Sequence, residues 1–392
     1  MFEPLRNQPF LLNPASTLEH MRLNHPVYRY ESSATPIVNV FGYHQSKKLL
    51  REVETFSNTL TGNQEGKGAT DPYNLLGMDP PDHKRMRDVV SAVFTPKMIQ
   101  SIEPNIRRNA SDIMQDVLAM EECDAVEDFG AKLAVHLICQ LIGVPEEDKP
   151  LMREWTREAS ELGFDLLWHP ETDPSYEARI EQSMNRMHDY FGTAIDRRLK
   201  NPGDDVLTEI AKSGLTREES VSFARLLLVA GNETTTNLIN HILRLMILYP
   251  AVARDLRQNS DLAVNMLAET LRFAPPIRGT FREARADTEI AGVPVYKDEI
   301  VWAWIFSANR DPDLCEDPQE FQLHRTPPNH IAFGHGIHTC LGITLAKMEA
   351  RVMLDTVLEY TSDIEPLSDD LFPIDSLLSN GFVHQPLRFI PK

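Results

Sequence analysis

Cys340 is the residue whose type and position most clearly suggest chemistry. It lies near the end of a glycine-rich stretch, Ile331–Gly342 (IAFGHGIHTCLG), which leads into a helix-forming sequence. A thiol at the start of a helix meets unpaired backbone N–H groups and the positive end of the helix dipole, and both stabilise a thiolate. Gly334 and Gly336 let the backbone approach a flat ligand. The segment therefore predicts a thiolate that binds a metal or reacts.

Other interpretations of Cys340 stay open from the residues alone. The thiol can be inert and buried, or it can join His335 and His338 in a zinc site, although that set lacks a fourth ligand. Nucleophilic catalysis would need a partner histidine and an orienting Asn or Asp, which the sequence does not exclude.

A long apolar segment predicts the central helix of the protein. Thr216-Arg217-Glu218-Glu219 fits a capping box, and the run that follows continues to Tyr249, where Pro250 stops it. At 1.5 Å per residue this helix would be about 50 Å long. Apolar residues occupy nearly every face, which predicts burial on all sides.

The middle of this helix, Ala230–Thr236 (AGNETTT), contains residues that oppose a stable buried helix. They are a glycine, a carboxylate and three β-branched threonines. A local opening, in which Gly231 admits another group and Thr234 bonds an internal carbonyl, would make room for a ligand or water. The alternative is a kinked core helix with a solvated Glu233.

A third feature is the pair Glu269 and Arg272, three residues apart on a predicted helix. Ser260 or Asp261 is expected to cap this helix, which ends at Phe273 before two prolines. An ion pair of this kind on a surface is common and contributes little, so alone it indicates no function.

The elements that must position these residues are predicted to be mainly helical. Strand-like runs appear near the N-terminus and before the cysteine segment, a helix follows Cys340, and neither repeats nor alternating βα units occur. We therefore expect one mainly α (α+β) domain over residues 1–392, richer in strands at about 25–60 and 285–325. The expected strands are Val27–Tyr30, Ile37–Phe41, Glu289–Gly292 and Ile300–Phe306, with helices over about 96–250 and loops at 170–175 and 201–205.

Composition excludes several classes of partner. The net charge of −19 argues against nucleic acid, because phosphate recognition needs clustered Lys and Arg. Residues 1–30 contain no uninterrupted apolar run, so we expect neither a signal peptide nor a membrane anchor, and a cytoplasmic protein. The four cysteines (Cys123, Cys139, Cys315 and Cys340) are too far apart for a disulfide framework.

Taken together, these motifs resemble the cytochrome P450 family in its soluble bacterial form, over essentially the whole chain. Phe333–Gly342 fits the family's haem loop, Glu269-Thr-Leu-Arg272 its Glu-x-x-Arg motif, and Ala230–Thr235 its oxygen-activating helix. The order and spacing also agree. Further matches are Pro80–Arg87, Arg282–Ala284 with Asp287, Asn309–Pro312 and Arg325.

The resemblance implies a haem b cofactor and assigns residues to it. Cys340 would be the axial thiolate ligand of the iron, in a loop that includes Phe333, Gly334 and Gly342. The haem propionates would be held by His83, Arg87, Arg282 and His338. Glu269, Arg272 and Arg325 would form a structural charge cluster behind the cysteine.

The resemblance also implies the reaction. Glu233 and Thr234 match the acid and alcohol that organise water and deliver protons to dioxygen, beside which Ala230 and Gly231 leave room. One oxygen atom would enter a C–H bond, and two electrons would come from a separate ferredoxin or flavodoxin with its reductase. Lys84, Arg85 and Lys347 are candidates for its docking patch. A peroxide-driven peroxygenase and a haem sensor without turnover are the alternatives.

The substrate is predicted to be a hydrophobic small molecule, such as a fatty acid, terpenoid or steroid. Apolar residues gather at Leu162–Trp168, and the segments that would contact substrate include Ile277, Arg278, Leu377, Leu378 and Phe382. Arg278 lies after Pro275-Pro276, where it would anchor a substrate carboxylate. The alternative is that it points away from the pocket or binds a propionate.

Overall fold

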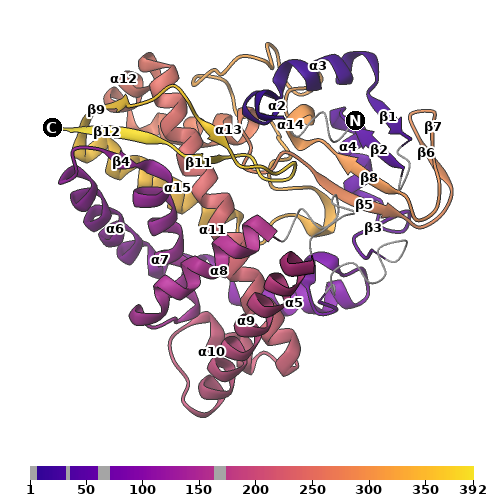
Figure 1. Cartoon of the computed structure of the whole chain (residues 1–392), viewed down its shortest axis with the longest axis horizontal. Helices are drawn as coiled ribbons and strands as arrows, with labels where there is room; N and C mark the ends of the chain where they lie inside the picture. Colours follow the sequence, from indigo (N-terminus) through magenta and orange to yellow (C-terminus); the bar gives the residue numbers. More distant parts are fainter. Residues whose placement is uncertain (1–6, 32–35, 61–70, 163–173) are drawn as a thin grey trace.

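The computed structural model describes residues 7–31, 36–60, 71–162 and 174–392. It confirms a mainly helical α+β protein: helices fill one side and the centre, and a small sheet lies at the other side (Figure 1). In chain order the helices are α2 (Gln8–Leu12), α3 (Ala15–Asn24), α4 (Tyr43–Arg51), α5 (Asp82–Val93), α6 (Pro96–Leu118), α7 (Ala131–Ile142), α8 (Lys149–Leu162), α9 (Pro174–Lys200), α10 (Val206–Lys212), α11 (Arg217–Leu248), α12 (Pro250–Gln258), α13 (Ala263–Phe273), α14 (Ile305–Ala308) and α15 (Ile343–Tyr360). The strands are β1 (Val27–Tyr30), β2 (Ile37–Val40), β3 (Phe56–Ser57), β4 (Cys123–Asp124), β5 (Thr280–Ala284), β6 (Thr288–Ile290), β7 (Val293–Val295), β8 (Ile300–Ala303), β9 (Thr361–Pro366), β10 (Phe372–Pro373), β11 (Phe382–His384) and β12 (Pro386–Pro391).

Helix α11 is the predicted central helix. Its capping box is present: the Thr216 hydroxyl accepts a hydrogen bond from the Glu219 N–H at 3.2 Å, and the Glu219 carboxylate accepts one from the Thr216 N–H at 2.8 Å. The helix ends at Leu248, just before the predicted stop at Tyr249 and Pro250. It packs against α7, α8, α9, α13 and α15, so it is surrounded by other helices as its apolar faces predicted.

The largest sheet has the strand order β1-β2-β8-β5-β3. Strands β1 and β2 form the predicted antiparallel pair, with Val27 opposite Val40 and Tyr30 opposite Ile37. Strand β8 pairs in parallel with β2 and antiparallel with β5, so this sheet is mixed. The remaining small sheets are antiparallel.

Three predicted strands extend beyond the strands of the structure, of which Ile37–Phe41 differs by one residue because β2 ends at Val40. Strand β8 stops at Ala303, and residues Ile305–Ala308 form helix α14 instead of continuing the strand to Phe306. Both halves of this apolar run are buried, and a short apolar run fits a buried helix as well as a buried strand. The expected strand Glu289–Gly292 is cut by a hairpin turn, because Ala291 and Gly292 have φ angles of 51° and 79°.

The start of α13 also differs from the expectation. Neither Ser260 nor Asp261 caps α13; Asn259 instead caps the turn before it, where its side chain accepts a hydrogen bond from the Asp261 N–H at 3.1 Å. A 3₁₀ turn over Ser260–Leu262 follows, so the helix itself begins at Ala263. The predicted loop at 201–205 is confirmed between α9 and α10. Of the loop predicted at 170–175, residues 170–173 lie outside the described residues and 174–175 begin α9.

Candidate active site

Cys340 is held in a tight loop between a 3₁₀ turn at Gly336–His338 and the start of α15. Its N–H donates to the Phe333 carbonyl at 2.9 Å, and Gly334, at a φ of +75°, makes the turn between them. The thiol remains exposed, although it belongs to a loop packed into the protein. Desolvation raises the pKa of Cys340, whereas the Gly342 N–H and the charge of Arg87 lower it. The favourable effect of the Gly342 N–H at the helix start is therefore present, but desolvation by the protein atoms packed around the accessible thiol outweighs it.

The two glycines of the loop serve different purposes. A Cβ at Gly336 would lie 2.5 Å from the Leu50 carbonyl oxygen, so this glycine lets the loop pack against the backbone of α4. The expectation that Gly336 faces a flat ligand is wrong. A Cβ at Gly334 would meet nothing closer than the His338 carbonyl at 3.6 Å, so space remains beside it.

The unusual middle of α11 forms continuous helix and not the expected local opening. The Thr234 hydroxyl donates to the Ala230 carbonyl at 2.8 Å, as predicted, and Ala230 is exposed although it lies in a buried helix. One carboxylate oxygen of Glu233, Oε1, is buried without a hydrogen-bond partner among the described residues. Gly231 instead packs against Ile138 of α7, so it does not leave room for a ligand.

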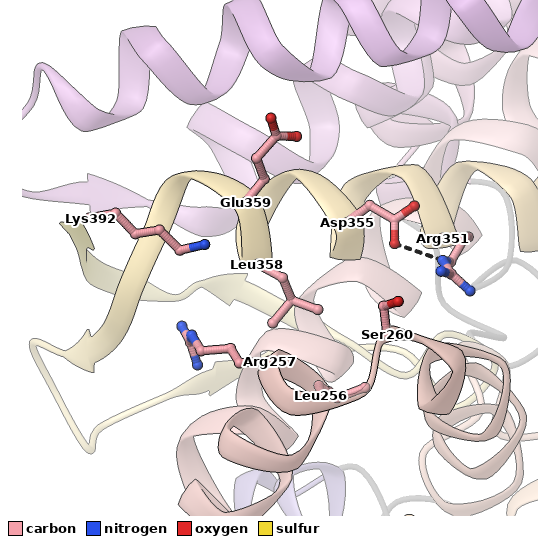
Figure 2. A pocket seen from close by; sticks show the side chains of 8 residues that line it. All are labelled: Leu256, Arg257, Ser260, Arg351, Asp355, Leu358, Glu359 and Lys392. Atoms are coloured by element: carbon pink, nitrogen blue, oxygen red, sulfur yellow. Dashed lines mark hydrogen bonds and ion pairs between the residues drawn. The ribbon is translucent and has the colours of Figure 1, made fainter.

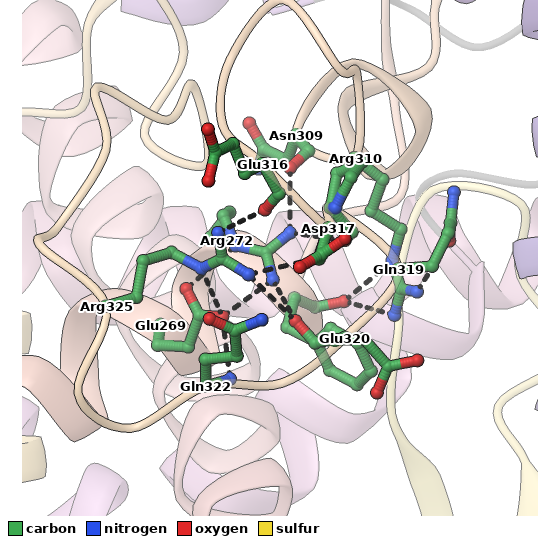
Figure 3. Close-up of polar contacts among 12 residues, drawn as sticks. Glu269, Arg272, Asn309, Arg310, Glu316, Asp317, Gln319, Glu320, Gln322 and Arg325 are labelled. Atoms are coloured by element: carbon green, nitrogen blue, oxygen red, sulfur yellow. Dashed lines mark hydrogen bonds and ion pairs between the residues drawn. The ribbon is translucent and has the colours of Figure 1, made fainter.

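The predicted charge cluster is formed between α13 and the segment 309–325 that precedes the cysteine loop in the chain (Figure 3). Arg272 donates from Nε and Nη2 to the two carboxylate oxygens of Glu269 at 2.8 and 2.7 Å, and Arg325 Nε donates to the same carboxylate at 3.1 Å. Arg272 also donates to the carbonyls of Asn309 and Pro318. Both partners of the central pair are almost fully buried. The cluster thus fixes the irregular segment before the cysteine loop onto α13.

His83, Arg87, Arg282 and His338 come together from α5, β5 and the cysteine loop. The rings of His83 and His338 lie 4.2 Å apart, and Arg87 Nη2 donates to the Thr339 carbonyl at 2.6 Å. Burial lowers the pKa of Arg282 to about 10 and that of His338 to about 3, and the pKa of His83 falls for the same reason. Nε2 of both histidines and Nε of Arg282 are buried without hydrogen-bond partners among the described residues. Such a group of donors suits an anionic ligand.

Comparison with known proteins decides the family. Residues 175–390 match the family model described as Cytochrome P450. The chain is 34% identical to Cytochrome P450 109 of Bacillus spizizenii over 403 aligned residues, which cover 100% of this chain and 95% of that protein. The chain belongs to the cytochrome P450 family. It is therefore a monooxygenase whose cofactor is haem b.

Solved structures agree with this cytochrome P450 fold. P450BioI in complex with hexadec-9Z-enoic acid ligated acyl carrier protein has a TM-score of 0.89 and 28% identity, over 97% of this chain and 99% of that one. CYP109E1 from Bacillus megaterium, solved with corticosterone, has a TM-score of 0.86 and 32% identity, again over 97% and 99%.

The chain's own residues fit the haem. An exposed thiol, an exposed Ala230 in a buried helix and buried donors without partners are the features expected where a flat dicarboxylate cofactor belongs. The zinc interpretation fails, because no group of three His, Cys, Asp or Glu among the described residues is placed to hold a metal ion. None of the described helices combines the length and apolar character needed to cross a membrane.

Arg278 of this cytochrome P450 is not placed as a carboxylate anchor. The side chain is fully buried, and its guanidinium donates to the backbone carbonyls of Ser376, Ser379 and Leu11. Burial lowers its pKa to about 9, and Glu233 acts in the opposite direction. Arg278 therefore joins α2 to the C-terminal segment, and sequence could not reveal this because its partners are distant backbone atoms.

The other predicted substrate residues divide into two groups. Leu377 and Leu378 are buried in a core cluster with Phe10 and Trp304, so they are structural. Ile277 and Phe382 keep partial exposure, and the Phe382 ring lies 5.4 Å from that of His241 on α11. The apolar stretch Leu162–Trp168 lies outside the described residues, except for the backbone of Leu162 at the end of α8.

The expected docking patch is mostly neutralised. Lys84 pairs with Asp88 on the same helix, and Arg85 pairs with Glu219 at the start of α11. Lys347 is exposed on α15 and lies 5.8 Å from the Phe333 ring centre. Arg85 therefore connects α5 to α11, which leaves Lys347 as the best placed of the three cations.

A surface pocket of about 490 Å³ lies away from these residues, between α12, α15 and the C-terminus (Figure 2). Its charges are partly satisfied, since Arg351 donates to Asp355 at 2.7 Å and Arg257 donates to two backbone carbonyls. It contains none of the predicted site residues.

Glu349 is a buried group that sequence analysis missed. It lies on α15 with 1% exposure and hydrogen-bonds to Thr235 of α11, so it connects the helix after the cysteine loop to the central helix. Burial raises its pKa to about 8, and the Thr235 bond opposes this. The sequence did contain an indication of its burial, because Glu349 lies on the same helix face as the apolar residues Leu345 and Val352.

We expect Glu349→Gln to remove a pH-dependent loss of stability. Because the pKa of Glu349 is about 8 in the folded protein against an ordinary 4.5, the folded state holds the proton longer and its stability falls as pH rises between these values. The unfolding free energy of the variant relative to wild type should rise by up to about 1.4 kcal/mol per pH unit in this window. Urea unfolding between about pH 5 and pH 8 measures this difference. A difference that does not change with pH would contradict the assignment.

Proposed function

We propose that this cytochrome P450 hydroxylates a hydrophobic small molecule of the fatty acid, terpenoid or steroid class. We also propose that it takes its electrons from a separate ferredoxin or flavodoxin with its own reductase. The observation that carries the proposal is the pair Glu233 and Thr234, held at mid-helix in α11 next to an exposed Ala230. A carboxylate and a threonine there oppose helix stability, which favours a role in chemistry. Two solved relatives carry a fatty acyl group and a steroid, which supports the substrate classes.

The residues around the cofactor are assigned as follows. Haem with a thiolate ligand supplies the oxygen chemistry, in which one atom enters a C–H bond and the other leaves as water. Cys340 is the thiolate ligand, in the loop that includes Phe333, Gly334 and Gly342. The donors for the two propionates are His83, Arg87, Arg282 and His338, whose unpartnered nitrogens support this role.

Glu233 and Thr234 act on protons. The Thr234 hydroxyl donates to the Ala230 carbonyl in this structure, and rotation of the same hydroxyl lets it donate to a ligand beside Ala230. Glu233 Oε1 is a buried acceptor that a water molecule can satisfy, which supports a role in supplying protons to Thr234. We further propose that residues 1–392 act as one domain, with Lys347 in the surface that receives the electron donor.

We expect Thr234→Ala to separate electron use from product formation. With reductase and ferredoxin added, the variant should still consume NADPH when substrate is present, but hydroxylated product per NADPH should fall at least about ten-fold, with peroxide released instead. Thr236→Ala is the matched control, because the Thr236 hydroxyl makes the same bond to the fourth preceding carbonyl, at 2.9 Å, from a buried position. Equal product yields in wild type and both variants would argue against the proposed role of Thr234.

A further inference from the structure

Arg225 is a half-buried cation on α11, and its charge is poorly satisfied. It lies about two turns before Glu233 on α11, where this helix contacts Met184 of α9. Its Nη1 lies 3.4 Å from one oxygen of Asp71, and its Nη2 donates to the Met184 thioether at 2.9 Å. The side chains of Arg225 and Asp71 retain 17% and 21% exposure.

The guanidinium edge formed by Nε and Nη2 has no oxygen partner. Nε is buried without a hydrogen-bond partner among the described residues, and a thioether is a weak acceptor for Nη2. This is the edge with which Arg272 binds the carboxylate of Glu269 through two hydrogen bonds. Arg278, by contrast, is held by three backbone carbonyls. Arg225 is thus a half-buried arginine of α11 whose side-on edge has no oxygen partner among the described residues and is available for a carboxylate.

The surface of α11 between Arg225 and Thr234 is apolar and partly open. Leu226, Leu227 and Val229 keep partial exposure and Ala230 is exposed, whereas Leu228 is fully buried. Arg225 lies nine residues before Thr234, which corresponds to about 13 Å along the helix. Nine residues are also about two and a half turns, so Arg225 and Thr234 leave opposite faces of α11. A substrate held at Arg225 and oxidised beside Thr234 would need an apolar body of at least that length, which crosses the helix over Val229 and Ala230.

We propose that Arg225 binds the carboxylate of an amphipathic substrate, such as a long-chain fatty acid, and positions its apolar chain along α11. This inference rests on the proposed function and narrows its substrate class. The carboxylate takes Nε and Nη2 in place of the Met184 thioether, which a flexible methionine side chain allows. Oxidation then falls far from the carboxylate, toward the end of the chain. Asp71 keeps its contact with Nη1 and competes for the same charge.

The test is a titration of the haem-loaded protein with hexadecanoic acid and with its methyl ester, following the absorbance change on ligand binding. Wild type should bind the acid at least about ten-fold more tightly than the ester, because a hydrogen-bonded charge pair contributes on this scale. Arg225→Gln should lose this preference and leave ester affinity unchanged. Asp71→Asn should strengthen acid binding, since it removes the competing carboxylate.

Arg244→Gln is the matched control, because Arg244 is another half-buried arginine of α11, nearer its C-terminal end. It should bind acid and ester as wild type does. Equal affinity of wild type for acid and ester would overturn the proposal, as would an equal loss of both ligands in Arg225→Gln or weaker acid binding in Asp71→Asn. In each case the carbon monoxide spectrum of the reduced protein reports separately on the haem-thiolate function.

Discussion

Glu269→Gln is expected to lower the free energy of unfolding by about 3 kcal/mol or more, because it leaves two buried arginines without their shared carboxylate. Arg272 is fully buried and Arg325 nearly so, and both donate to Glu269 in the wild-type protein. The backbone N–H of Gln322 also donates to this carboxylate, at 3.1 Å. Haem content should fall with stability, since the cluster holds the segment that leads to the cysteine loop. Urea unfolding and haem absorbance per protein measure the two effects.

Glu103→Gln provides the control for this prediction. Glu103 pairs with Arg107 at 2.8 Å on α6, but the two side chains are 35% and 46% exposed to solvent. An exposed pair of this kind contributes about 0.5 kcal/mol or less, so the control should unfold almost as wild type does. Similar unfolding free energies for the two variants would contradict a structural role for the Glu269 cluster.

The parts of the fold predicted correctly from sequence carry local signals. The capping box at Thr216–Glu219, the proline after Tyr249 and the short β-prone runs of β1 and β2 all act within a few positions of the chain. The helix predicted after Cys340, which is α15 in the structure, also has a local sequence signal. These features are set by neighbouring residues, so a single sequence is sufficient to find them.

The errors have a common cause in long-range packing. Whether the apolar run after Ile300 continues as strand or turns into α14 depends on the sheet and helices around it. Gly231 and Gly336 looked like openings for a ligand, but their missing side chains make room for Ile138 and for the backbone of α4. A glycine in the sequence indicates that another group packs closely against the backbone, but it does not show whether that group is a ligand or part of the protein.

The same limit applies to charged residues of the candidate site. Arg278 was expected to bind a substrate carboxylate, yet its carbonyl partners come from the N-terminal and C-terminal segments. Arg225 and Glu349 were missed because each looks like an ordinary polar position on a helix. Their burial and incomplete bonding emerge only when α9 and α15 pack against α11.

We expect Cys340→His to abolish hydroxylation while leaving a folded protein. The thiolate is the proposed source of the electron density that favours O–O cleavage, and imidazole does not supply it. Product formation with reductase, ferredoxin and substrate should fall below detection, whereas circular dichroism should match wild type. Cys315→Ser is the control, because Cys315 is a half-buried cysteine that lies outside the loop. Its activity should be unchanged.

The most direct test of thiolate ligation is the absorption spectrum of the dithionite-reduced protein with carbon monoxide, compared between wild type and Cys340→His. We predict a strongly red-shifted Soret band in wild type and in Cys315→Ser, and its loss in Cys340→His. A red-shifted band that survives the Cys340 substitution, or a wild-type protein that binds no haem, would contradict the assignment of Cys340 as the axial ligand.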